Sequence, residues 1–221
     1  RPYEKEKGSV EALHQKWLKR CQHFVSAKHM SFFTFQKMCR QIVEEFDAIP
    51  ITDELKPRVG IVGEILVKFA PAANNHLVEL LESEGAEAEV PDFLDLHLYC
   101  LYNKIYKAQE LGTSKKTALI SRIGINALEF LRSSASKALS RSQHFTPATS
   151  IYETVENAKS IVSIGNQTGE GWFLTGEMIE LIHGGVNNIV CTQPFACLPN
   201  HVVGKGVIKE LRKQYPLSNI V

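Results

Sequence analysis

Apolar residues recur every three or four positions in two stretches near the start of the chain, residues 9–28 and 31–47. This spacing places the apolar side chains on one face of a helix. Ser9 and Ser31 stand where these helices would begin, and a serine hydroxyl can cap the free amides there. The stretch around Pro50 then breaks the pattern. The sequence therefore predicts a helical lead-in over residues 1–55.

From Arg58 onward, short apolar runs alternate with helical patterns. The runs are typical of strands that are buried on both faces, and we expect them at residues 59–66, 86–90, 159–165, 188–191 and 219–221. Helical patterns cover residues 76–84, 93–111, 114–140, 151–158, 170–183 and 200–215. This order predicts an α/β domain over residues 56–221, with a Rossmann-like, open, mainly parallel sheet and helices on both faces. In such a sheet, ligands bind where the loops after the strands meet.

The two ends of the chain lead us to expect a fragment of a longer protein. The first residue is Arg1 rather than an initiator methionine, and the last predicted strand is cut off at Val221. We therefore expect the α/β domain to be truncated at its C-terminus.

Charge and composition argue against several classes of partner. The chain has 221 residues, of which 25 are basic and 24 acidic, so no field of one sign attracts nucleic acid or an anionic membrane. No apolar run approaches the ~20 residues that span a bilayer. The five cysteines are scattered and odd in number, which favours a reducing compartment over a disulfide framework. We expect a soluble, cytoplasmic protein without nucleic-acid or membrane partners.

The segment from Cys191 to His201 is the richest in chemistry. Cys191 ends a predicted strand, and Cys197 follows in a loop stiffened by two prolines. Asn200 can cap the next helix, so that Cys197 lies close to a helix N-terminus, where a thiolate is stabilised. Thiolates are the ligands of iron–sulfur clusters. The plainer alternative is that Cys191 is a small core residue and Cys197 a free loop thiol.

A glycine-rich turn at residues 165–171 offers a second candidate. Its amides and the following helix could receive a phosphate or another anion. The pattern matches neither a dinucleotide fingerprint nor a P-loop, and Glu170 would repel an anion. The alternative is a tight turn with a capping carboxylate. Trp172, just after the turn, either lines a pocket or packs in the core.

The remaining candidates are weaker. The loop from Lys68 to Asn75 could reach a ligand at the sheet edge, although Asn74 or Asn75 more simply caps the next helix. The histidines show no paired spacing, so a zinc site is not predicted. Three other cysteines fall on apolar helix faces and are expected in the core: Cys21, Cys39 and Cys100.

Three motifs together resemble a known superfamily. They are Gly169-Glu-Gly-Trp-Phe-Leu-Thr-Gly-Glu-Met178, Gln193-Pro-Phe-Ala-Cys-Leu-Pro-Asn-His-Val202 and Gly204-Lys-Gly206. They resemble the 2-hydroxyacyl-CoA dehydratase and benzoyl-CoA reductase superfamily. They look most like the C-terminal part of the large fused proteins known as CoA-substrate-specific enzyme activases.

The resemblance implies Rossmann-like domains that hold iron–sulfur clusters on cysteines from neighbouring domains. It implies electrons from an ATP-hydrolysing activator domain or subunit, and acyl-CoA substrates. By this likeness Cys197 is the best cluster ligand here and Cys191 the second. The residues that would shape the site around the cluster are Gly169, Glu170, Gly171, Trp172, Asn200 and His201.

The same resemblance sets limits on what this chain does alone. The ATPase motifs of the activator are absent from the sequence, so we expect no ATP hydrolysis. The other cluster cysteines would lie in other domains of the parent chain, so we expect the cluster in the intact parent rather than here. Two alternatives stay open: a non-redox Rossmann-like module that binds a nucleotide or CoA phosphate, and a docking domain for an activator ATPase.

Overall fold

The computed structural model describes residues 1–221, which divide into two compact units. The first unit comprises residues 1–55 and 126–148, and the second comprises residues 56–125 and 149–221. The long helix α6 (Lys115–Leu139) contributes residues to both. None of the helices is both long and apolar enough to cross a membrane.

The first unit contains α1 (Ser9–Val25), α2 (Phe32–Asp47) and the C-terminal half of α6, close to the predicted helices. Ser31 caps α2 as predicted, because its hydroxyl accepts a hydrogen bond from the Thr34 amide at 3.4 Å. Ser9 does not cap α1. It is the first helical residue, and the Glu4 carboxylate accepts from both its hydroxyl (3.1 Å) and the Val10 amide (2.8 Å).

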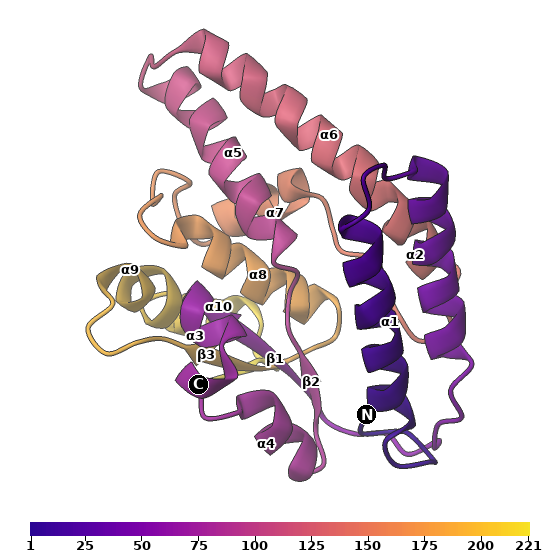
Figure 1. The fold of residues 1–221 in the computed structure, drawn as a ribbon. Coiled ribbons are helices and arrows are strands. Elements are labelled where there is room, and N and C mark those ends of the chain that lie inside the picture. The colour runs from indigo at the N-terminus through magenta and orange to yellow at the C-terminus, as the bar shows by residue number, and fades with distance from the viewer. The chain divides into compact units, whose positions relative to one another are not determined.

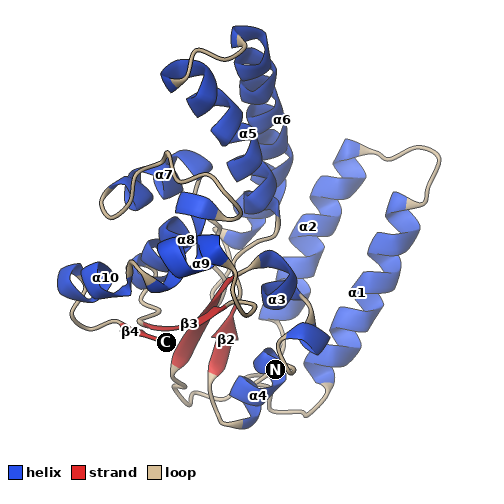
Figure 2. Ribbon diagram, turned by 90° about the vertical axis from the view of Figure 1, so that its left-hand side faces the viewer, coloured by secondary structure: helices blue, strands red, loops and turns tan.

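The second unit is built on a four-stranded parallel sheet, drawn in red in Figure 2. Its strands are β1 (Arg58–Gly63), β2 (Glu87–Glu89), β3 (Asn188–Thr192) and β4 (Asn219–Ile220), in the order β2-β1-β3-β4. The other elements are α3 (Ile65–Phe69), η1 (Pro71–Ala73), α4 (Leu77–Ser83), α5 (Leu94–Glu110), α7 (Ile151–Lys159), α8 (Gly171–His183), α9 (Leu198–Asn200), the π-helical turn η2 (His201–Lys205) and α10 (Ile208–Gln214) (Figure 1). The predicted α/β class is confirmed.

Strand β1 lies at the centre of the core. Ile61 and Val62 point to opposite faces of the sheet, and both are 0% exposed, as the apolar run predicts for a strand covered on both sides. On one face α8 packs so closely that a Cβ on Gly60 would lie 2.6 Å from the Leu181 side chain. Helix α8 is apolar almost all round and has only two residues that are not buried, Glu180 and His183.

The strand predicted at residues 159–165 does not form. The amides of Ile161 and Val162 both donate to the Ala158 carbonyl, so the chain leaves α7 in a turn. Ile161 and Val162 still pack against the core, which accounts for their apolar character without a strand. The sheet therefore has four strands instead of five.

Two boundaries also differ from prediction. β1 ends at Gly63, and the predicted strand residues after it begin α3, which is capped by the Glu64 carboxylate accepting from the Val67 amide at 2.9 Å. The helix predicted at residues 200–215 is divided into α9, η2 and α10.

The strand order places a topological switch point between β1 and β3. The connection from β1 leads to β2 on one side, and the chain then returns to place β3 and β4 on the other side. Gly63 and Thr192, the last residues of β1 and β3, are paired in register. In open parallel sheets, the crevice beyond such a pair of strand ends is where ligands bind.

Candidate functional site

The ends of β1 and β3 are fixed against each other. Gly63 has a φ of +137°, and a Cβ there would lie 1.8 Å from the Thr192 carbonyl oxygen. That oxygen accepts from the Glu64 amide at 2.9 Å, and the Thr192 hydroxyl donates to the Val62 carbonyl at 3.0 Å. The paired ends of β1 and β3, which we call the floor of the candidate site, are therefore rigid backbone. They require glycine at position 63.

The glycine-rich turn is braced from the interior. Gly169 and Gly171 have φ values of +61° and +50°, which glycine adopts without strain. The Tyr99 hydroxyl lies within donating distance of the carbonyls of Gln167 (3.0 Å) and Gly169 (2.9 Å). Burial raises the pKa of Tyr99 to about 12, so its hydroxyl keeps the proton that it donates.

Trp172 supports the turn from the core. Its indole is 0% exposed and its Nε1 donates to Asn103 Oδ1 at 2.9 Å. The rings of Tyr99 and Tyr102 meet it edge to face at 5.1 and 5.7 Å between centroids. In this conformation the side chain of Trp172 reaches no ligand surface, and its role is to hold the start of α8.

Asn200 brings the thiol of Cys197 and the carboxylate of Glu170 together. Its side-chain nitrogen lies 3.1 Å from Cys197 Sγ and 3.2 Å from Glu170 Oε2. The other carboxylate oxygen accepts from the Ile65 amide at 3.3 Å. An ionised carboxylate can only accept, so it fixes the amide nitrogen of the fully buried Asn200 toward the sulfur. Residues predicted separately in the glycine-rich turn and the cysteine segment are thus in contact, and we call Glu170, Cys197 and Asn200 the Cys197 group.

Three buried polar atoms on this edge have no hydrogen-bond partner. They are Gln167 Nε2, Gln193 Oε1 and Asn200 Oδ1, out of five such atoms in the structure. They belong to the glycine-rich turn, the loop after β3 and α9, and the turn and α9 are in contact where a Cβ on Gly169 would lie 3.2 Å from Pro199. Buried polar groups are nearly always paired, so a concentration of unpaired ones indicates a site for a polar ligand or for water.

Cys191 lies in a different setting from Cys197. A Cβ on Gly204 would lie 3.0 Å from its sulfur, so η2 covers it closely. Burial, with a smaller contribution from Glu177, raises the pKa of Cys191 to about 11. Cys197 is half-buried, whereas Cys100, expected in the core, is exposed on α5.

His201 lies at the outer side of the group formed by Glu170, Cys197 and Asn200. It is exposed, and its Nδ1 lies 3.5 Å from Gln193 Nε2. No group of three or more histidine, cysteine, aspartate or glutamate side chains in the chain is arranged to hold a metal ion. At this edge, the thiol of Cys197 is the one with a side-chain amide donor, Asn200.

A buried ion pair that the sequence did not reveal joins α3 to α8. Lys68 Nζ on α3 is 2.6 Å from Glu177 Oε1 on α8, and the two side chains are 1% and 2% exposed. Burial raises the pKa of Glu177 to about 7, although Lys68 opposes the shift; Asp95 and Glu180 add to it. The pair joins the element after β1 to the centre of α8.

The raised pKa of Glu177 predicts a pH-dependent stability. The folded-state pKa of about 7 lies above the ordinary value of 4.5, so the folded state holds this proton more tightly. Glu177 therefore favours folding at low pH, and its contribution falls as the pH rises from 4.5 to about 7. We expect urea unfolding of the wild type and Glu177→Gln to diverge over this range, with the wild type losing relative stability. A constant difference would contradict the shift.

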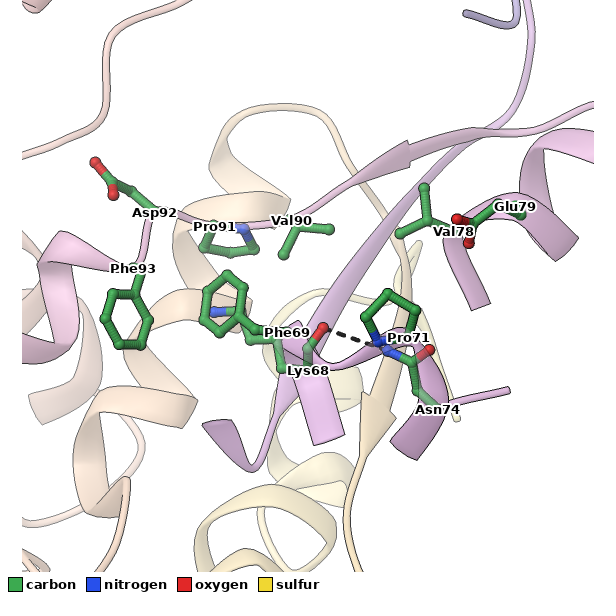
Figure 3. A pocket seen from close by; sticks show the side chains of 10 residues that line it. All are labelled: Lys68, Phe69, Pro71, Asn74, Val78, Glu79, Val90, Pro91, Asp92 and Phe93. Atoms are coloured by element: carbon green, nitrogen blue, oxygen red, sulfur yellow. Dashed lines mark hydrogen bonds between the residues drawn. The ribbon is translucent and has the colours of Figure 1, made fainter. Parts of the chain in front are cut away.

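A concavity lies at the ends of β1 and β2. It has a volume of about 430 Å³, and Figure 3 shows its lining. Phe69 and Phe93 meet edge to face with centroids 5.2 Å apart. Asn74 is tied to the backbone, since its side-chain nitrogen donates to Val67 O at 2.8 Å and its oxygen accepts from the Leu77 amide at 3.1 Å. Asn74 thus accepts from the first amide of α4, although the N-cap residue is His76 and not Asn74 or Asn75 as predicted. The pocket walls are mainly apolar.

Comparisons of the chain with protein-family models, curated proteins and solved structures give no significant match.

Proposed function

We propose that this chain is a Rossmann-like module of an iron–sulfur redox protein, related to the 2-hydroxyacyl-CoA dehydratases and their activators, in which Cys197 ligates a cluster. The observation that carries the proposal is the hydrogen bond from the buried Asn200 amide to Cys197 Sγ, 3.1 Å long, at the edge between β1 and β3. The remaining protein ligands would come from other domains of the parent chain. Electrons would come from an ATP-dependent activator, and the substrate class would be acyl-CoA.

The surroundings of Cys197 supply a hydrogen-bond donor to its sulfur. The Asn200 amide N–H is directed at the sulfur, and hydrogen bonds to the sulfurs help to set the potential of a cluster. Glu170 holds the amide in this orientation, which is how outer groups tune a metal site. The cluster would supply one-electron transfer, while this chain would bind it through Cys197 and orient it through Asn200. Cys191 stays the second candidate ligand; its sulfur is packed against Gly204, so it is less accessible to a cluster.

The geometry does not favour a phosphate site at the glycine-rich turn. Glu170 is 7% exposed and lies at the start of α8, where an anion would have to bind. A bound phosphate would then face a buried negative charge.

The proposal is tested on the full-length natural chain that contains these residues. Reconstitution with iron and sulfide under anaerobic conditions is followed by iron analysis, visible absorption and electron paramagnetic resonance of the reduced protein. We expect Cys197→Ala to lose the bound iron and the visible absorption. The matched control, Cys100→Ala, removes an exposed thiol of the same unit and should keep both.

A second variant separates ligation from folding. Asn200→Ala keeps the thiol but removes its N–H donor, so we expect the cluster to remain with a more negative reduction potential. If Cys197→Ala keeps as much iron as the wild type while its circular dichroism is unchanged, Cys197 is not a ligand and the proposal fails.

A further inference from the structure

The first unit has a pocket of its own, between α2 and the end of α6. Its volume is about 340 Å³, within the roughly 300–1,000 Å³ typical of small-molecule sites. The lining residues are Phe33, Gln36, Lys37, Arg40, Ser134, Lys137, Ala138 and Arg141. All of them belong to the first unit.

The pocket concentrates positive charge in a chain that is nearly neutral. Four of its eight lining residues are cationic and none is acidic. Lys37, Lys137 and Arg141 form no salt bridge, and Arg40 has only an exposed contact of 4.0 Å with Glu44. Basic residues in the last turn of a helix complement its dipole, but this accounts only for the α6 end and not for Lys37 and Arg40 on α2. Such a cluster favours an anion with several negative charges.

Ser134 supplies an independent indication of a ligand. The residue is 7% exposed, and its hydroxyl oxygen is buried with no hydrogen-bond partner. It lines the pocket together with the cations. A serine hydroxyl can donate to a phosphate oxygen, so an anion in the pocket would satisfy a group that the protein leaves unpaired.

An exposed aromatic ring lies among the lining residues. Phe33 is 81% exposed, whereas its neighbour Phe32 stacks on Phe130 at 5.2 Å between centroids. An exposed ring beside a cationic pocket is the arrangement on which planar bases stack while their phosphates are neutralised. The Phe33 ring and the four cationic side chains together indicate a ligand with a planar ring and a negatively charged tail.

We propose that this pocket binds a nucleoside di- or triphosphate, with the phosphates between the four cations and Ser134 and the base on Phe33. This pocket lies in the first unit, whereas Cys197 lies in the second, so the inference does not depend on the proposed function. A long nucleic acid is less suitable, because the cations gather in one concavity instead of following a stripe.

Calorimetric titration of the whole chain tests the site with ATP, inorganic triphosphate and adenosine. We expect ATP to bind more tightly than triphosphate and adenosine not to bind. Lys137→Ala with Arg141→Ala should weaken both anions at least about tenfold, because a charge-assisted hydrogen bond contributes about 1.5–3 kcal/mol. Ser134→Ala should weaken both by a smaller factor.

Two controls make the outcome decisive. Phe33→Ala should reduce ATP affinity toward that of triphosphate and leave triphosphate unchanged. Lys19→Ala with Lys28→Ala removes the same charge from exposed positions of the same unit and should change neither affinity appreciably. The proposal is overturned if this control weakens binding as much as the pocket variant, if ATP and triphosphate do not bind, or if a single-stranded oligonucleotide binds the pocket more tightly than ATP.

Discussion

Glu177→Ala is expected to destabilise the second unit by about 3–5 kcal/mol, because it leaves the Lys68 ammonium buried without its partner. The two side chains are only 1% and 2% exposed, so water cannot replace the lost carboxylate. The measurement is urea unfolding at about pH 8, above the raised pKa of Glu177, so that the wild-type pair is ionised. Circular dichroism reports the loss of the helices of the second unit.

A matched pair at the surface provides the control. Lys159 and Glu156 have the same 2.6 Å separation but are 48% and 70% exposed, so Glu156→Ala should cost less than about 1 kcal/mol. Replacing both buried partners, Lys68→Met with Glu177→Leu, should restore most of the stability, because no unpaired charge remains. Equal effects of Glu177→Ala and Glu156→Ala would show that the Lys68–Glu177 pair is accessible to water.

Gly63→Ala is expected to destabilise the second unit by roughly 3 kcal/mol, since backbone strain and a steric clash add at one position. The new Cβ would lie 1.8 Å from the Thr192 carbonyl oxygen, in a backbone conformation with φ at +137°. The ends of β1 and β3 would have to separate, which removes the floor of the candidate site. Calorimetric unfolding should show a lower transition temperature for this unit.

Gly85→Ala separates strain from the clash. Gly85 also has a positive φ, +86°, but nothing lies within 4 Å of its Cβ position. Its substitution should therefore cost only about 1 kcal/mol. If Gly63→Ala costs no more than Gly85→Ala, the strand ends are able to relax and do not form a rigid floor.

The helices were predictable because burial on one face leaves apolar residues every three or four positions, and most strands because burial on both faces leaves a short apolar run. The segment with Ile161 and Val162 shows why one strand was not. Its apolar side chains enter the core from a turn after α7, and a short apolar run carries no information on backbone direction. Periodicity also does not say which helices pack together, so the association of residues 126–148 with the first unit was not foreseen.

The candidate site was predictable where neighbours in sequence are also neighbours in space. Cys197 and Asn200 are three positions apart, and both were singled out from residue type and position. The partners that complete the site come from elsewhere: Ile65 binds Glu170 across 105 positions, and Lys68 meets Glu177 across 109. The cationic pocket was missed for the same reason, because Lys37 and Lys137 stand on helices far apart along the chain.

The two oxygens of Glu170 serve distant parts of the chain, one the backbone at the start of α3 and the other the side chain of Asn200. A rotation of this single carboxylate must alter both contacts together. A shift of the segment after β1 would therefore be transmitted to the sulfur of Cys197 without any direct contact between them. The hydrogen bond at that sulfur is thus connected to the start of α3 through Glu170 and Asn200.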